Sequence, residues 1–180
     1  MPQSVAELIA QLHADPPFEG FFFHASRIED IADLQGSECS LEQPYYALLF
    51  FTQGEGLASY PSLDYEQYFT APAISFVLAG VSTHFTLTQP LKGYLVLADE
   101  QALSKRDTIS MDLASTFDVG HVIQTPRYAP FFEQLLEMMR QDCLNPYSLS
   151  ADTVIMAKSL FAIWLARETE VQLQHYAGDK

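Results

Sequence analysis

Residues 45–56 read YYALLFFTQGEG, a run of aromatic and aliphatic residues that ends in a glycine-rich segment. Further short apolar runs follow at residues 57–60, 65–69, 74–78, 85–87 and 93–98. Aromatic and β-branched residues favour strands, and the Gly, Pro and Ser residues between the runs favour turns. Strands spaced this evenly are typical of an antiparallel barrel or sandwich rather than of a parallel sheet.

Turn residues separate most of these runs. Gln53-Gly54-Glu55-Gly56 predicts a hairpin turn, because glycine adopts positive φ without strain. Ala79-Gly80-Val81-Ser82 and Gln89-Pro90 are predicted to separate the later strands. A short strand is also expected at residues 21–24, and one more at residues 119–124.

Amphipathic spacing predicts helices on both sides of the strand region. Ser4 is expected to cap the first helix, with Glu7 three residues later completing a capping box. Over residues 127–143, apolar residues recur at three- and four-residue steps, which predicts a second helix. Ser150 is expected to cap a third helix over residues 151–174.

The length of 180 residues suits one structural domain with a sizeable core. We expect a mainly β fold with α-helices, in which an antiparallel β-barrel carries an N-terminal helix and two C-terminal helices packed antiparallel. The expected parts are an N-terminal helix and arm at residues 1–20, a barrel at 21–125 and a helical dimerisation hairpin at 126–180.

The chain is strongly acidic, with 23 Asp and Glu against 9 Lys and Arg and a formal net charge of −14. Proteins bind a phosphate backbone through Lys and Arg, so we predict no direct nucleic-acid binding by this chain. The N-terminal region has amphipathic rather than continuous apolar spacing, so neither a signal peptide nor a membrane span is predicted. A cytoplasmic protein with reduced cysteines and no membrane association is the expectation.

No catalytic motif is evident, and we expect neither enzymatic activity nor a cofactor. Barrel enzymes that hold a transition metal usually supply two histidines separated by one residue on a strand, whereas residues 45–49 here read YYALL. One alternative stays open, a metal-dependent cupin enzyme of the isomerase or oxygenase kind. It requires His24, His84 and His121 to converge from separate segments.

Aromatic and polar side chains on the predicted strands are candidates for a binding site. Core packing is their plainest role, but a buried tyrosine hydroxyl needs a hydrogen-bond partner, so an apolar cup lined by tyrosines suits a small molecule. A filled barrel that serves only as a structural interaction domain is the other alternative. The candidate ligand-binding residues are Tyr46, Gln53, Tyr60, His84 and Tyr94.

The third predicted helix is apolar over more of its circumference than one contact with a barrel requires. This surplus predicts an interface between two copies of the chain, so we expect a homodimer. The candidate interface residues are Phe132, Leu136, Ile155, Leu160, Ile163 and Trp164.

Residues 45–56, together with ISFVLAG at 74–80, His84-Phe85 and KGYLVLA at 92–98, resemble the N-terminal domain of AraC-type transcriptional regulators. The resemblance covers about residues 21–103, and its motifs are short and apolar. It implies a cupin-like barrel that senses a small effector and dimerises through C-terminal helices, while a separate helix-turn-helix domain binds DNA. We therefore expect either the sensor fragment of a longer regulator or a stand-alone relative.

Two positions depart from the family pattern. Ala79-Gly80 stands where the family has Pro-Gly, and the glycine still supplies the turn. In sugar-sensing relatives the position that resembles Gln53 can be a basic contact to the ligand. Because Gln53 is neutral, we expect an uncharged or weakly polar effector.

Overall fold

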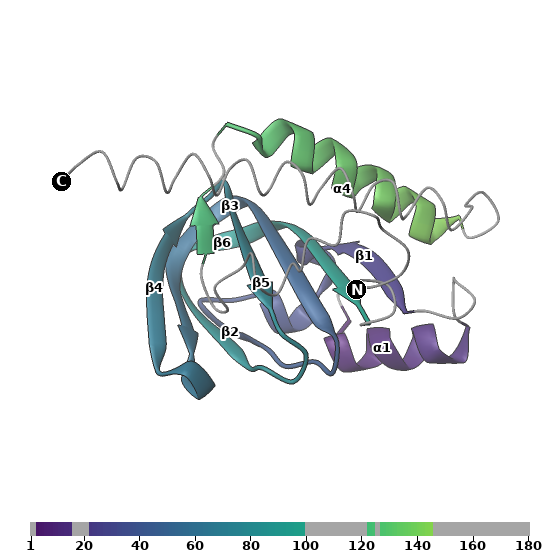
Figure 1. Ribbon diagram of the computed structural model, residues 1–180, viewed down its shortest axis with the longest axis horizontal. Helices are drawn as coiled ribbons and strands as arrows, with labels where there is room; N and C mark the ends of the chain where they lie inside the picture. Colours follow the sequence, from purple (N-terminus) through teal and green to yellow (C-terminus); the bar gives the residue numbers. More distant parts are fainter. Residues whose placement is uncertain (1–2, 16–21, 100–121, 125–126, 146–180) are drawn as a thin grey trace, which may run out of the picture.

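The computed structural model describes residues 3–15, 22–99, 122–124 and 127–145. One curled antiparallel sheet of seven strands dominates these described residues (Figure 1). A mainly β fold is therefore confirmed. The strands are β1 (Phe23–Arg27), β2 (Glu38–Leu41), β3 (Tyr46–Tyr60), β4 (Tyr65–Thr70), β5 (Ala73–Val77), β6 (Thr83–Ala98) and β7 (Val122–Gln124).

The two longest strands, β3 and β6, form the centre of the sheet. The strand order is β1-β6-β3-β5-β7, with β2 also paired to β6 and β4 also paired to β3. All of these pairs are antiparallel. β3 and β6 each pair with three other strands, so every strand except β7 pairs with one of these two.

The predicted hairpin turn at Gln53-Gly54-Glu55-Gly56 was wrong, because these residues lie inside β3. They form an irregular segment with register shifts against β6, and Gly54 has a φ of 128°. A Cβ on Gly56 would clash with the Thr86 carbonyl oxygen, and one on Gly93 with that of Phe50. The glycines therefore allow two bent strands to approach closely, as β-bulges do, instead of reversing the chain.

The predicted break at Gln89-Pro90 was also wrong, because β6 continues through it. Gln89 pairs with Glu55 in the irregular segment, where a proline costs no regular ladder bond. The turn at Ala79-Gly80-Val81-Ser82 is confirmed, with a φ of 75° at Gly80. β2 was not predicted from the sequence.

Helix α1 (Val5–Ala14) is confirmed, with the predicted capping box at its start. The Glu7 backbone N–H donates to Ser4 Oγ at 3.2 Å, and the Ser4 backbone N–H donates to Glu7 Oε2 at 2.9 Å. Two short 3-10 helices, η1 (Ile28–Asp30) and η2 (Ala32–Leu34), follow β1. A third, η3 (Pro61–Leu63), joins β3 to β4.

The two faces of the sheet carry two separate hydrophobic cores. On β3, Ala47 and Leu49 point to one face, and Leu48 and Phe50 to the other. We call the first the inner core and the second the outer core. The inner core consists of Val5, Leu8, Ile28, Ile31, Leu34, Cys39, Leu41, Ala47, Leu49, Phe51, Ala58, Tyr60, Phe69, Ala73, Val77, Phe85, Leu91, Leu95, Leu97 and Val122. The outer core consists of Phe23, Ala25, Phe50, Ile74, Phe76, Tyr94, Val96, Ala98, Phe132, Leu136 and Met139.

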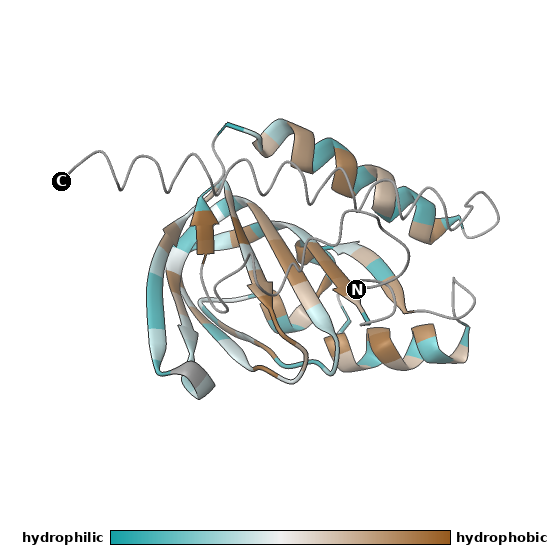
Figure 2. Ribbon diagram, in the orientation of Figure 1, coloured by the Kyte–Doolittle hydropathy of each residue, from teal (hydrophilic) through white to brown (hydrophobic). Residues whose placement is uncertain are grey.

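Helix α4 (Ala129–Leu144) covers the outer core, which confirms the helix predicted after Pro126. Figure 2 shows hydrophobic and hydrophilic residues alternating around α4 and α1, as expected for helices with one face on a core. Glu137 anchors α4 to the sheet through an ion pair with Arg27 at 2.8 Å and a hydrogen bond from the Tyr94 hydroxyl at 3.0 Å. Arg140 pairs with the same carboxylate at 2.7 Å, and the Arg27 guanidinium lies 4.2 Å from the centre of the Tyr94 ring.

Among the residues with described positions, neither helix has the length and apolar character that crossing a bilayer requires. The third predicted helix, residues 151–174, lies outside the described part of the chain.

Candidate functional site

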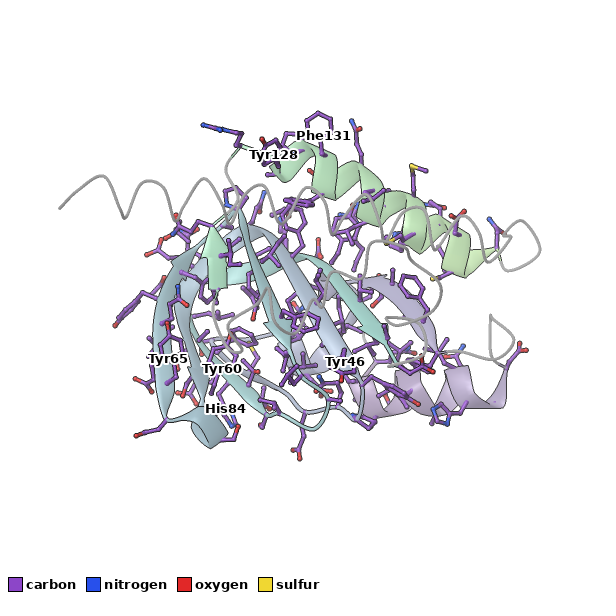
Figure 3. The ribbon with its side chains drawn as sticks, in the orientation of Figure 1. Tyr46, Tyr60, Tyr65, His84, Tyr128 and Phe131 are labelled. Atoms are coloured by element: carbon purple, nitrogen blue, oxygen red, sulfur yellow. The ribbon has the colours of Figure 1, made fainter. Side chains whose placement is uncertain are left out.

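The structure does not bring the five candidate ligand residues together. Tyr60 lies in the inner core, whereas Tyr94 lies in the outer core and Tyr46 packs against the outer core. Gln53 and His84 are exposed. Figure 3 shows Tyr60 and Tyr65 on one side of the molecule and Tyr46 on the other.

A change of phase within β3 explains the separation of Tyr46 from Tyr60. Before the irregular segment, the odd-numbered residues Ala47, Leu49 and Phe51 belong to the inner core. After it, the even-numbered Ala58 and Tyr60 do. A bulge that adds one residue reverses the alternation, so two tyrosines an even number of residues apart lie on opposite faces.

Tyr60 makes a fully buried hydrogen bond inside the sheet, with its hydroxyl 2.8 Å from Ser75 Oγ. Since Tyr60 is at the end of β3 and Ser75 is on β5, this bond connects two walls of the inner core. Burial raises the pKa of Tyr60 to about 12, although the bond from Ser75 acts in the opposite direction. The phenol therefore stays protonated and neutral near pH 7.

Thr83 adds a second buried hydroxyl beside Tyr60. Ser59 on β3 pairs with His84 on β6, and the two strands are antiparallel. The next position along places Thr83 opposite Tyr60, so the two residues are cross-strand neighbours. The Thr83 side chain is fully buried, and its Oγ1 atom has no hydrogen-bond partner in the part of the chain that the structure describes.

Gln67 on β4 connects to β7 through its side-chain amide. Its Nε2 donates to the Val122 carbonyl oxygen at 2.9 Å, and its Oε1 accepts from the Val122 N–H at 2.8 Å. The Tyr65 hydroxyl also donates to Oε1, at 3.2 Å. The Gln67 amide therefore bonds to the Val122 backbone as a neighbouring strand would. Val122 is also the register partner of Ser75, so this contact lies close to the Tyr60–Ser75 bond.

His24 and Ser26 bring two more polar groups to the inner face. Their neighbours Phe23 and Ala25 belong to the outer core, so the alternation of β1 directs His24 and Ser26 to the opposite side. Their register partners confirm this side, because His24 pairs with Leu97 and Ser26 with Leu95. Both His24 Nδ1 and Ser26 Oγ are buried without a hydrogen-bond partner among the described residues.

The titratable groups on this inner face are uncharged near pH 7. Burial lowers the pKa of His24 to about 4, so the imidazole is neutral. Burial also raises the pKa of the Cys39 thiol to about 11, which leaves it protonated and a poor nucleophile. Among the described residues that are buried as a whole, the polar ones are Gln43, Ser75 and Thr83, and all three are neutral. Such an interior suits recognition of a neutral molecule better than acid–base chemistry.

The structure describes two of the three histidines of the alternative metal site, His24 and His84, and these two do not face the same region. His24 faces the inner core, His84 is exposed on β6, and His121 lies outside the described residues. No group of three or more His, Cys, Asp or Glu side chains that could hold a metal ion occurs in the described ranges.

Two of the six candidate interface residues pack within their own chain. Phe132 and Leu136 are 0% and 1% exposed and belong to the outer core under α4. The outward side of α4 instead presents Met138, which is 55% exposed, and Leu144, which is 59% exposed. The other four candidates, Ile155, Leu160, Ile163 and Trp164, lie outside the described residues.

Sequence reasoning missed most of the polar groups that face the inner core. Ser26, Gln67, Ser75 and Thr83 were not candidates, and His24 was considered only as a metal ligand. The alternation of apolar and polar residues in Phe23-His24-Ala25-Ser26 contained a usable signal. It marks one face of a strand as polar, but only the pairing with β6 shows that this face is the inner one.

Comparison with known proteins gives matches at the level of structure alone. No known family and no curated protein matches the sequence. One similar solved structure is the AraC-like transcriptional activator CuxR, with a TM-score of 0.47 and 11% identity, over 71% of this chain and 43% of that one. Two others are structures of ToxT from Vibrio cholerae.

An apo variant of ToxT has a TM-score of 0.47 and 7% identity, over 81% of this chain and 55% of that one. Wild-type ToxT bound to an unsaturated fatty acid has a TM-score of 0.46 and 8% identity, over 84% and 57%. The chain thus spans about half the length of these neighbours. Similarity of this degree assigns neither an activity nor a ligand to the chain.

Proposed function

We propose that the chain is the small-molecule-sensing and dimerisation domain of an AraC-type transcriptional regulator, acting in the cytoplasm and without catalysis. The resemblance of residues 45–56, 74–80 and 92–98 to that family supports the proposal. The mainly β antiparallel architecture is compatible with it. A formal charge of −14 favours a separate DNA-binding part over contacts made by this chain.

One observation carries the sensing half of this proposal. His24 Nδ1, Ser26 Oγ and Thr83 Oγ1 are buried without hydrogen-bond partners on the side of the sheet that holds the inner core. Most buried polar side-chain atoms in proteins have a partner, and each exception calls for an explanation. A small molecule inside the curled sheet supplies the missing partners for such atoms.

The curled sheet is proposed to be a cupin-like barrel. The two Gln67–Val122 bonds favour closure, because they join β4 to β7 across a point where the described residues form no strand ladder. In this arrangement the Tyr60–Ser75 bond crosses the interior. The ligand-binding candidate retained from the sequence is Tyr60, next to Thr83.

The dimerisation half rests on the C-terminal helices. The inward side of α4 is occupied by contacts to the sheet, so a partner molecule is expected on the side of Met138 and Leu144. The apolar helix predicted for residues 151–174 is proposed to pack antiparallel to α4 and to complete the interface with Ile155, Leu160, Ile163 and Trp164.

A melting-temperature screen of the full chain against a library of small metabolites tests the sensing function. A compound that binds the folded state raises the melting temperature with concentration. We expect at least one neutral compound to do so, and Ser26→Ala to reduce the rise. The matched control is Ser40→Ala, an exposed serine on β2, which is expected to leave it unchanged. If the library produces no rise in the wild-type chain, the domain is a filled structural module and the proposal fails.

A further inference from the structure

The ligand of the inner core can be specified further, on the basis of the proposed function. We propose that it is a neutral aliphatic alcohol whose hydroxyl group binds between His24 Nδ1 and Ser26 Oγ. This names the chemical class of the effector and assigns its polar anchor to β1, which the residue candidates from sequence do not include.

The two anchor residues project from the same face of β1. His24 and Ser26 are successive residues on one face of a strand, so their Cα atoms are about 6.6 Å apart. An oxygen atom that makes two hydrogen bonds of about 2.8 Å joins groups up to roughly 5.6 Å apart. This reach is about 1 Å shorter than the Cα separation, so one hydroxyl bridges the two groups when their side chains lean towards each other.

The donor and acceptor chemistry also selects a hydroxyl group. A neutral imidazole presents Nδ1 either as a donor or as an acceptor, depending on its tautomer, and a serine hydroxyl does both. An alcohol matches every combination, because it also donates one hydrogen bond and accepts others. A carboxylate only accepts, and an ammonium group only donates.

The surroundings exclude a charged head group. Among the described residues that are fully buried, the polar ones are Gln43, Ser75 and Thr83, and none of them is ionised. The Arg27–Glu137–Arg140 cluster lies with α4 on the outer side of the sheet. Burying an ion without a partner costs far more than burying a hydroxyl group that is hydrogen-bonded.

Carboxylates at the margin of the inner core add to the selection against anionic ligands. Glu29 accepts a hydrogen bond from the Gly93 N–H at 3.1 Å, and Asp99 accepts one from the Phe22 N–H at 2.8 Å. Asp33 accepts one from the Val5 N–H at 2.7 Å. Each negative charge repels an anionic ligand in the same region.

The apolar part of the ligand follows from the side chains that line β1 and its neighbours. Across the sheet, His24 pairs with Leu97, which pairs with Ala47 on its other side. In the same way, Ser26 pairs with Leu95, which pairs with Leu49. All four partner residues are aliphatic. The aromatic part of the inner core is elsewhere, where Phe51 packs against Phe69 at 4.9 Å and against Phe85 at 5.8 Å between ring centres. An aliphatic tail therefore matches the surface next to the anchor.

Isothermal titration of the full chain at pH 7 with 1-octanol and 1-decanol tests the inference, with decanoate and decylamine as charged controls of matched length. We expect the alcohols to bind and the two charged compounds to bind at least tenfold more weakly. Ser26→Ala and His24→Leu are each expected to weaken alcohol binding about tenfold, the effect of one lost hydrogen bond at a buried site. Ser40→Ala is expected to have no effect.

The outcomes distinguish an error in the ligand class and its anchor from an error in the sensing function. Tighter binding of decanoate than of 1-decanol, or full alcohol affinity in both β1 variants, overturns the assignment of ligand class and anchor but leaves the sensing function standing. The same conclusion follows if the alcohols do not bind but a library compound of another class raises the melting temperature. If neither the alcohols nor any library compound binds, the proposed function is lost as well.

Discussion

Replacing Gln67 removes the side-chain amide that joins β4 to β7, and the cost can be worked out from its two bonds. In Gln67→Leu, the N–H and C=O of Val122 lose partners at 2.8 Å and 2.9 Å, and Val122 is only 4% exposed. An unsatisfied buried polar group costs about 1–3 kcal/mol. Gln67 is only partly buried, so water can replace part of the lost hydrogen bonding. We therefore expect a total loss of about 2–3 kcal/mol in the free energy of unfolding.

Gln67→Glu distinguishes hydrogen bonding from packing, since the two side chains have nearly the same shape. An ionised carboxylate accepts from the Val122 N–H but has no proton for the Val122 carbonyl oxygen, so we expect a loss of about 2 kcal/mol at pH 7. A protonated carboxyl group restores both bonds. Folding therefore raises the pKa of the introduced group, and its stabilising form is present at low pH and lost as pH rises.

The assay is urea unfolding of wild type and both variants at pH 7 and pH 5. The deficit of Gln67→Glu relative to wild type at the same pH is expected to shrink at pH 5, while that of Gln67→Leu stays constant. Gln53→Glu, at an exposed position, is the control and is expected to show a small deficit at both pH values. A pH-independent deficit in Gln67→Glu would refute the bidentate contact with Val122.

Three further predictions concern other contacts. His24, whose pKa burial lowers to about 4, takes up a proton in the unfolded chain first, so stability is lost as pH falls from about 6.5 towards 4. Between pH 7 and pH 5 this loss is about 2 kcal/mol, and His24→Leu should remove it in urea titrations. Glu137→Gln, which breaks the ion pairs with Arg27 and Arg140, should lower stability by about 1 kcal/mol in 0.1 M salt, whereas Glu133→Gln on the same helix should not. Met138→Asp should shift the chain towards monomer in sedimentation equilibrium, and Tyr68→Asp, a change at a more exposed position on β4, should leave the association constant unaltered.

Local signals in the sequence predicted α1 and α4 well, while the helix predicted for residues 151–174 lies outside the described residues. The capping box of Ser4 and Glu7 needs only residues within one turn, and the structure has both of its bonds. The apolar stripe of α4 likewise depends on a short repeat that one packing face enforces. Both features are determined by neighbours a few residues away, so a pattern along the chain is enough to find them.

Glycines in β3 and β6 were harder to interpret, because the same residue serves two purposes. Gly54 and Gly56 are suited to a hairpin turn, but the structure uses them where β3 approaches β6 too closely for a side chain. The difference depends on a strand about 30 residues later in the sequence. A local pattern contains no information about that distant partner.

The residues of the candidate site depended on the same irregular segment. Tyr46 and Tyr60 were grouped because both lie on predicted strands, but the bulge between them reverses the faces. Tyr60 was a candidate and lies in the inner core, whereas Ser75 and Thr83 were not candidates, because small hydroxyl residues on strands give no signal of burial. Strand register supplies this information, and it is set by long-range pairing.

Intermolecular NOEs between 1-decanol and the methyl groups of the chain test the central claim, that a neutral ligand binds inside the curled sheet. Leu95 and Leu97 belong to the inner core, while Leu48 packs against the outer core and Val96 belongs to it, so neighbouring residues serve as internal controls. The account predicts NOEs to Leu95 and Leu97 and none to Leu48 and Val96. NOEs to the outer pair alone, or equal NOEs to both pairs, would contradict it.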